Sequence, residues 1–86
     1  MTEETARVER CESWKCKIGS KLKMRVEGEW ISAEIIVLAQ CPIKAAVALD
    51  GEKFYALEFG FDGRFACGFA YEEFPEAFEK FKEIIW

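Results

Sequence analysis

The chain has 86 residues, which is enough for one domain and too few for two hydrophobic cores. Its formal net charge is −4 and it has no histidine, so it lacks the usual general base near neutral pH and the commonest nitrogen ligand for metals. The charged start, MTEETARVER, has no apolar segment of the kind found in signal peptides. Because cysteines without an export signal are expected to stay reduced, we expect a cytoplasmic protein.

The first half of the chain predicts an arm followed by two strands. Residues 1–12 are charged with few apolar anchors, which indicates a flexible arm or a short helix. In KLKMRV the side chains of Leu22, Met24 and Val26 alternate with cations, as in a half-exposed strand. After a turn at Glu27 and Gly28, EWISAEIIVLA forms a longer strand. We expect one face with Ile31, Ala33, Ile35 and Val37, and the other with Trp30, Ser32, Glu34, Ile36 and Leu38.

Three more strands are predicted before residue 71. IKAAVAL alternates so that Ile43, Ala45, Val47 and Leu49 point inward. Asp50-Gly51 then predicts a tight hairpin in which both turn residues have positive φ, and KFYALEF is its second strand. A second Asp-Gly, at 62 and 63, leads into RFACGFA, where Phe65, Cys67 and Phe69 share a face. Residues 13–70 therefore predict a five-stranded antiparallel sheet.

The last segment, residues 71–86, predicts a helix. In YEEFPEAFEKFKEIIW, one helical stripe contains Phe74, Phe78, Phe81 and Ile85. Pro75 suits the first helical turn, and the stripe is expected to pack against an open end of the sheet. The predicted fold class is mainly β with a C-terminal α-helix (α+β). All three segments belong to one domain, a barrel or strongly curled sheet packed by the helix.

The order of these motifs resembles that of SH3-like small barrels, and in its first two strands that of Tudor domains. The resemblance covers residues 14–59 and rests on Trp14-Lys15, Gly19-Ser20, KLKMRV, Glu27-Gly28, WISAEI and KAAVALDGEKFYAL. Tudor domains hold a methylated Lys or Arg in an aromatic cage. The positions aligned with that cage are Val26, Ile31, Leu49 and Lys53 or Phe54, of which Phe54 alone is aromatic. The resemblance therefore implies the barrel and does not carry over the cage.

Nothing in the sequence indicates an enzyme or a cofactor. No hydroxyl side chain stands beside a base that would activate it, and the glycines form no phosphate-cradling motif. CESWKC contains the one close cysteine pair, whereas structural zinc sites use two such pairs. We expect no metal, with Cys11 and Cys16 as the alternative ligand pair.

The first functional hypothesis is a non-enzymatic protein-interaction module. An exposed patch of aromatic and aliphatic side chains would mark its binding face, and the acidic helix is a second candidate surface. The candidate protein-binding residues are Trp30, Ile36, Leu38, Tyr55 and Trp86. The partner is then a protein of unknown identity, no membrane contact is expected, and a homodimer is an open alternative.

Two alternatives belong to other classes. Cations near an exposed ring suit single-stranded RNA or DNA, with phosphates on the cations and a base on the ring. The candidate nucleic-acid-binding residues are Trp14, Lys15, Lys17, Lys21, Lys23 and Arg25. The pI near 4.9 opposes this alternative, because nucleic-acid-binding domains are typically basic. The last alternative is a small acidic inhibitor that occupies a basic surface on a partner protein.

Overall fold

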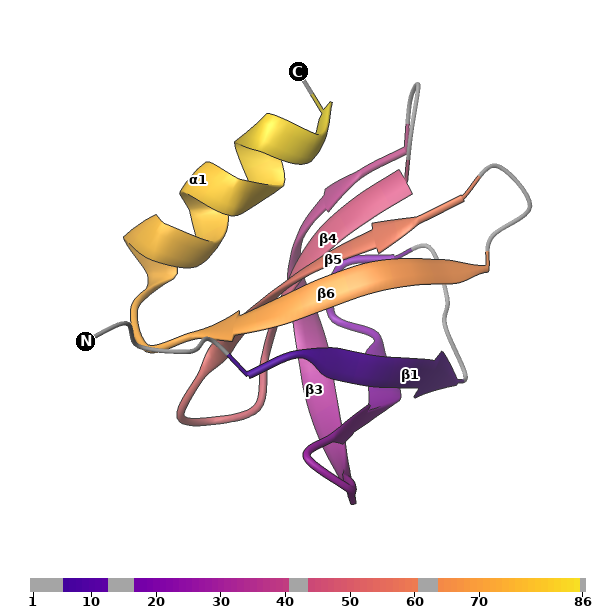
Figure 1. The fold of residues 1–86 in the computed structure, drawn as a ribbon. Helices are drawn as coiled ribbons and strands as arrows, with labels where there is room; N and C mark the ends of the chain where they lie inside the picture. Colours follow the sequence, from indigo (N-terminus) through magenta and orange to yellow (C-terminus); the bar gives the residue numbers. More distant parts are fainter. Residues whose placement is uncertain (1–5, 13–16, 41–43, 61–63, 86) are drawn as a thin grey trace.

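The computed structural model describes residues 6–12, 17–40, 44–60 and 64–85, which form six strands and one helix (Figure 1). In chain order these are β1 (Val8–Glu12), β2 (Lys21–Val26), β3 (Glu29–Ala39), β4 (Lys44–Leu49), β5 (Phe54–Phe59), β6 (Phe65–Tyr71) and α1 (Phe74–Ile85). The strands form one antiparallel sheet in the order β1-β2-β3-β4-β5-β6. The predicted mainly-β fold with a C-terminal helix is confirmed.

The expected count of five strands is wrong, because the N-terminal segment contributes a sixth. Residues 1–12 were expected to form an arm or a short helix, whereas Val8–Glu12 pairs with β2. Two side chains anchor this strand: Val8 is buried, and Cys11 packs against the barrel core. A bulge between Val8 and Arg10 separates these anchors by three residues. The alternating pattern that identifies the other strands is therefore absent here.

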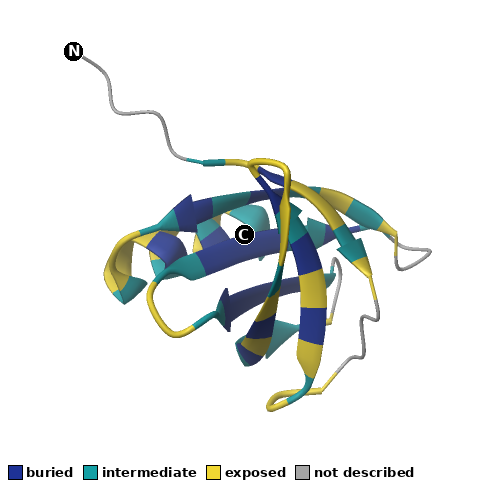
Figure 2. Ribbon diagram, turned by 90° about the horizontal axis from the view of Figure 1, so that it is seen from below, coloured by how far each residue is buried: buried dark blue, intermediate teal, exposed yellow. Residues whose placement is uncertain are grey.

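The β2–β3 hairpin has the predicted turn at Glu27 and Gly28. Its inward side chains alternate with exposed ones, which Figure 2 shows as successive dark and yellow bands. The φ angles of Glu27 and Gly28 are 52° and 81°, and a two-residue type I′ turn requires positive values at both positions.

The β4–β5 connection differs from the tight turn expected at Asp50-Gly51. Gly51 has a positive φ of 103°, whereas Asp50 is not among the residues with positive φ. The loop runs from Asp50 to Lys53 and is closed by a hydrogen bond from the Asp50 N–H to the Lys53 carbonyl oxygen at 3.3 Å. The second Asp-Gly pair, at 62 and 63, lies outside the described residues.

The sheet curls until its two edge strands meet, which gives a nearly closed barrel. β1 and β6 meet where Arg7 bridges to Phe69 and where the Ala70 N–H donates to the Ala6 carbonyl oxygen at 2.8 Å. Gly68 permits this approach, because a Cβ there would lie 3.1 Å from the Cβ of Val8. The barrel interior is filled by a core whose largest side chains are Phe59, Leu22, Met24, Ile35 and Leu57.

A bulge divides β3 into two parts that face differently. The register with β4 shifts between Ile35 and Val37, so that Ile36 and Val37 both belong to the cluster under the helix. Leu38 instead packs against the barrel core. The predicted strict alternation is therefore wrong beyond Ile35: Val37 does not share the inward face, and Leu38 does not share the outward one.

α1 forms a second layer on the outer surface of the sheet. It packs on β4, β5 and β6, and not over an open end of the sheet as expected (Figure 1). The predicted stripe of Phe74, Phe78, Phe81 and Ile85 faces this surface, and Ala77 and Phe81 are buried in it. The rings of Phe74 and Phe78 stack with 5.4 Å between their centroids, and those of Phe78 and Phe81 with 5.8 Å.

Because of this second layer, β4 is buried on both faces. Its Ala45 and Val47, which were expected to point into the barrel, lie under the helix, while Ala46 and Ala48 face the barrel interior. In β6, a register shift next to Phe59 separates Phe65 from the predicted shared face. Phe65 packs against the barrel core, whereas the Cys67 thiol contacts Glu58 and the Phe69 ring contacts the cations of Arg7 and Lys80.

Candidate functional site

The most prominent exposed ring among the described residues is that of Trp30, at the start of β3. Trp30 is 44% exposed and lies opposite Arg25 of β2. The guanidinium carbon of Arg25 lies 5.8 Å from the centroid of the Trp30 ring. Arg25 is held in turn by Glu9 of β1, with 3.4 Å between its Nε and a carboxylate oxygen. The indole is therefore placed by a chain of contacts across three strands.

We call the outer surface of β1, β2 and the first half of β3 the Trp30 face. It mixes cations and carboxylates: Lys21 lies opposite Glu34 and Lys23 opposite Glu12, whereas Arg10 lies opposite Arg25. The face therefore carries four cations against three carboxylates, namely Arg10, Lys21, Lys23 and Arg25 against Glu9, Glu12 and Glu34. The strand that looks basic in the sequence is thus close to neutral in the folded surface.

A hollow lies beside the exposed indole. It is lined by Glu12, Lys23, Trp30, Ile31 and Ser32. The hollow offers one carboxylate, one ammonium group, one hydroxyl and an apolar wall, which can together accept a partner's polar side chain next to an apolar one.

The other predicted protein-binding residues do not join Trp30. Ile36 packs with the cluster under α1, and Leu38 packs against the barrel core. Tyr55 is 3% exposed inside the barrel, so its ring is not part of a surface. Trp86 lies outside the described residues.

Three of the six predicted nucleic-acid-binding residues lie together on β2. Lys21, Lys23 and Arg25 share the Trp30 face. Lys17 is exposed in the turn that precedes β2, and Trp14 and Lys15 lie outside the described residues. Sequence reasoning missed Glu9 and Glu12 as members of this face, because β1 itself was not predicted.

The positions aligned with the Tudor cage meet a different environment. Val26, Ile31 and Lys53 line a hollow at one end of the barrel, between the β2–β3 turn and the β4–β5 loop. Its other described lining residues include four carboxylates, from Glu27, Glu29, Asp50 and Glu52. Phe54, the one aromatic residue in the alignment, instead packs on Phe74 of α1 at 5.7 Å.

Asp50 organises the loop beside this hollow. Its carboxylate accepts hydrogen bonds from the N–H groups of Glu52 and Lys53, both at 2.9 Å, and from the Tyr55 hydroxyl at 2.7 Å. Burial opposes ionisation of Asp50, but these hydrogen bonds outweigh it and lower its pKa below the usual 3.8. Burial and the adjacent Asp50 raise the pKa of Tyr55. The carboxylate thus acts here as a structural acceptor.

The two described cysteines lie in different surroundings. Burial raises the pKa of the Cys11 thiol to about 12. Burial and a hydrogen bond to Glu58, with 3.3 Å between sulfur and oxygen, raise the pKa of Cys67. Both thiols are therefore protonated and poorly nucleophilic at neutral pH. Cys16, which with Cys11 forms the alternative to the expected absence of a metal, lies outside the described residues.

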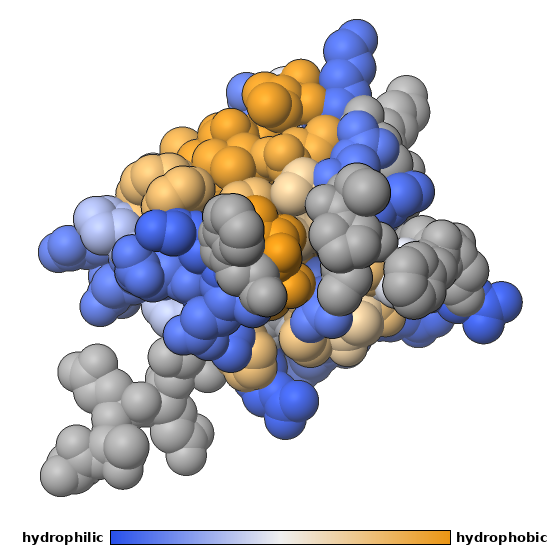
Figure 3. Space-filling model, turned by 90° about the horizontal axis from the view of Figure 1, so that it is seen from above, coloured by the Kyte–Doolittle hydropathy of each residue, from blue (hydrophilic) through white to orange (hydrophobic). Residues whose placement is uncertain are grey.

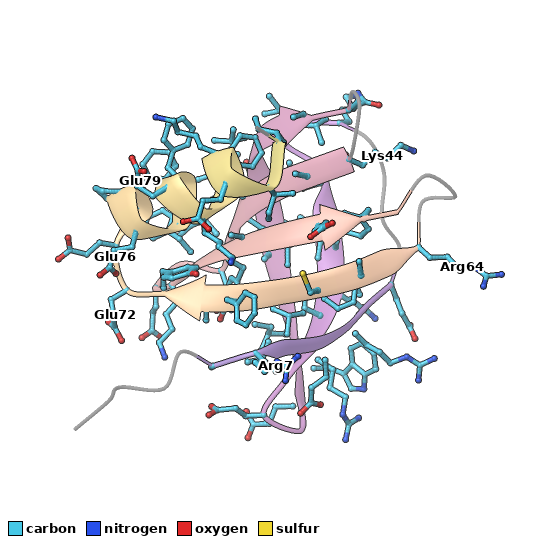
Figure 4. All side chains as sticks on the ribbon, turned by 45° about the horizontal axis from the view of Figure 1, so that its top comes forward. Arg7, Lys44, Arg64, Glu72, Glu76 and Glu79 are labelled. Atoms are coloured by element: carbon cyan, nitrogen blue, oxygen red, sulfur yellow. The ribbon has the colours of Figure 1, made fainter. Side chains whose placement is uncertain are left out.

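The acidic helix presents a separate surface. Figure 4 shows Glu76 and Glu79 of α1, and Glu72 just before it, pointing outward on the side of the molecule opposite Lys44 and Arg64. Lys80 and Lys82 partly neutralise this surface, because each pairs with a carboxylate three residues away on α1.

Comparisons with known proteins add no family to this description. The chain matches no protein-family model, no curated protein and no solved structure. No helix in the described part of the chain is long and apolar enough to cross a membrane. The geometry is that of a small, nearly closed antiparallel barrel with a C-terminal helix, which is compatible with an SH3-like fold.

Proposed function

We propose that this chain is a non-enzymatic protein-interaction module of the small-barrel, Tudor-like type, which binds a partner protein with the Trp30 face. The observation that carries the proposal is the placement of Trp30. A ring that is 44% exposed contributes little burial to the core, yet Arg25 and Glu9 hold its position.

Such a ring suits protein recognition. Trp and Arg are the residues most enriched at the energetic centres of protein interfaces, where a rigid ring loses little conformational entropy on binding. The neighbouring hollow and the mixed charges of the face supply the polar rim that such a centre needs. The resemblance of residues 14–59 to Tudor domains supports the barrel as a scaffold for binding. In this proposal the Trp30 face, and not an aromatic cage, is the binding surface.

The charge balance favours a protein partner over a nucleic acid. Phosphate binding draws its affinity from an excess of cations, and each cation of β2 here has a carboxylate nearby on β1 or β3. Binding of single-stranded RNA or DNA stays a prediction, as does the acidic inhibitor, which would use the carboxylates of α1.

A capture experiment with matched baits tests the proposal. The unmodified chain, Trp30→Ala, the Lys21→Gln/Lys23→Gln double variant and Ile18→Ala are each used as bait in native lysate with and without nuclease. Ile18 is the matched control, because it is another exposed apolar residue, at 59%. We expect a set of proteins that survives nuclease, disappears with Trp30→Ala, and persists with the double variant and with Ile18→Ala.

The opposite result is equally clear. Capture that collapses on nuclease treatment and with the double variant would replace this proposal with nucleic-acid binding. Capture that is unchanged by Trp30→Ala would show that the Trp30 face is not the binding surface.

A further inference from the structure

The second half of β3 has a strand neighbour on one side. β2 pairs with β3 as far as Glu34, and the last hydrogen bonds on that side join Gly19 and Ser20 to Ile35. Beyond Ile35, β4 is the one strand that pairs with β3 within the described residues. In the part of the chain that the structure describes, this leaves a short open edge, residues 36–40.

The main chain of Leu38 points toward this open edge. The N–H of Ile35 donates to Ser20 at 2.9 Å, and its carbonyl accepts from Gly19 at 2.8 Å, both on the side away from β4. Along a strand, side-chain face and main-chain direction alternate together. Ile35 and Leu38 both turn their side chains toward the barrel core, so Leu38 shares the direction of Ile35. Extending the same alternation by one residue beyond Ala39, the last residue of β3, turns the N–H of Gln40 toward the open edge.

The side chains beside this edge are apolar and only partly covered. Ile36, Val37 and Ala39 lie on the outer surface next to Ile84 and Ile85 of α1. All five are half-buried, because α1 packs mainly on β4 to β6 and covers this part of β3 only partly. Figure 3 views this end of the molecule, where hydrophobic side chains form a continuous area bordered by hydrophilic ones.

We propose that the open edge of β3 pairs with the same edge of a second copy of this chain, antiparallel about a two-fold axis at Leu38. Leu38 then exchanges both of its main-chain hydrogen bonds with Leu38 of the second copy. Val37 lies opposite Ala39 of the second copy, and the N–H of Gln40 meets the carbonyl of Ile36. The two apolar strips join into one surface across the axis.

A second copy fits because the edge is complementary to itself. No residue from Ile35 to Gln40 is charged, so a two-fold pairing opposes no like charges at its centre. Elsewhere two copies of a chain with net charge −4 would bring carboxylates together, as on α1. Edge strands of monomers usually carry Lys or Pro that prevents such pairing, and Ile36 to Gln40 contain neither. This inference goes beyond the proposed function, since it uses a surface other than the Trp30 face.

Sedimentation equilibrium of the full chain tests the pairing. We expect a monomer–dimer equilibrium with a Kd on the order of 10⁻⁵ M, because the interface is smaller than that of a standard complex. Gln40→Pro should raise Kd at least about tenfold, since it removes an N–H that faces only the edge and places a ring there. Val37→Lys should do the same by placing two ammonium groups near the axis.

The test needs a charge control and a check that both edge variants fold. Ala66→Lys adds the same charge at an exposed site on β6, which does not pair with β3, and should leave Kd unchanged. Circular dichroism and thermal unfolding of dilute samples establish whether Gln40→Pro and Val37→Lys are folded. A chain that stays monomeric at about 500 μM, well above the expected Kd, would overturn the proposal. A dimer that survives both edge variants would also overturn it. Neither result bears on the Trp30 face, which the capture experiment tests separately.

Discussion

The two halves of β3 differ in composition and in what they contact: the first half carries Glu29, Ser32 and Glu34, and the second half is wholly apolar. From Glu29 to Ala33 the strand pairs with β2 and buries one face, so that Trp30 and Ser32 meet solvent, and β4 joins on the other side at Glu34. From Ile36 to Ala39 it has one neighbour, and its two faces contact two different cores. One strand thus joins a polar surface to an apolar one, and the bulge at Ile36 marks the change.

This difference shows how so small a chain obtains two surfaces. A regular strand would place Ile36 and Val37 on opposite faces, and one of them would then enter the barrel. The bulge instead keeps both outside, where they extend the core under α1. The first half is free for polar recognition, while the second half depends on α1 for its cover.

Removing that cover should have the largest effect on stability. Phe81 is 4% exposed and lies between α1 and β4–β5. Phe81→Ala should lower the free energy of unfolding by about 3–5 kcal/mol, since it leaves a cavity in a small core. Urea denaturation followed by circular dichroism measures the loss. Glu76→Ala, on the exposed side of the same helix, should change the value by less than about 0.5 kcal/mol. Equal losses for the two variants would contradict a helix held by its Phe stripe.

The second largest effect on stability is expected where β1 and β6 meet, which we call the seam. A Cβ at Gly68 would lie 2.7 Å from Leu57 Cδ2, 3.1 Å from Val8 Cβ and 3.2 Å from the Ala56 carbonyl oxygen. Gly68→Ala should therefore lower the free energy of unfolding by about 1–3 kcal/mol, because Val8 and the Ala56 backbone cannot move as freely as the end of the Leu57 side chain. Hydrogen exchange at the Ala70 N–H, which bonds Ala6 across the seam, should speed up more than exchange in the β4–β5 pair. Uniform acceleration would mean that the seam is not a separate unit.

Much of this architecture is visible in the sequence. Period-two alternation locates β2 to β6 and the turn at Glu27-Gly28, and a four-residue Phe spacing locates α1. What alternation cannot reveal is a bulge, since an extra residue has no distinctive composition here. The bulge after Val8 hid β1 and with it Glu9 and Glu12.

The bulge at Ile36 had the corresponding effect on the sites. It reversed the expected faces of Val37 and Leu38, so Leu38 was wrongly grouped with exposed residues. Trp30 lies before the bulge, and its outward direction followed from the pattern. Its contact with Arg25 also follows from the hairpin register, whereas the contribution of Glu9 depends on a strand that the pattern does not show.

Removing the hydrogen bond between Tyr55 and Asp50, at the β4–β5 loop, should have a smaller and pH-dependent effect on the free energy of unfolding. Tyr55→Phe removes the hydroxyl that donates to Asp50 at 2.7 Å and should cost about 1–2 kcal/mol at pH 7. Because the folded pKa of Asp50 is below 3.8, its contribution is present above pH 3.8 and is lost as the pH falls through the folded pKa. The difference in the free energy of unfolding between the unmodified chain and Tyr55→Phe should therefore become smaller at acid pH. Urea unfolding from pH 7 down to about pH 2 measures this. A difference that is constant with pH would show that the carboxylate is not the partner that matters.

The smallest effect on stability should come from the Trp30 face itself. Glu9→Gln removes the ion pair that holds Arg25. The side chain of Arg25 is 42% exposed and that of Glu9 is 48% exposed. Exposed pairs of this kind contribute less than about 1 kcal/mol, so the free energy of unfolding should hardly change. The mobility of the indole should nevertheless increase, because Arg25 then loses its anchor beside the ring, and time-resolved fluorescence anisotropy reports that motion. The decay needs a background in which Trp14 and Trp86 are replaced by Phe, so that Trp30 is the single emitter. Faster decay at constant stability would show that the first half of β3 uses its contacts to place a ring rather than to hold the fold. A large loss of stability would mean instead that this face resembles the covered half, and the contrast between the two halves of β3 would disappear.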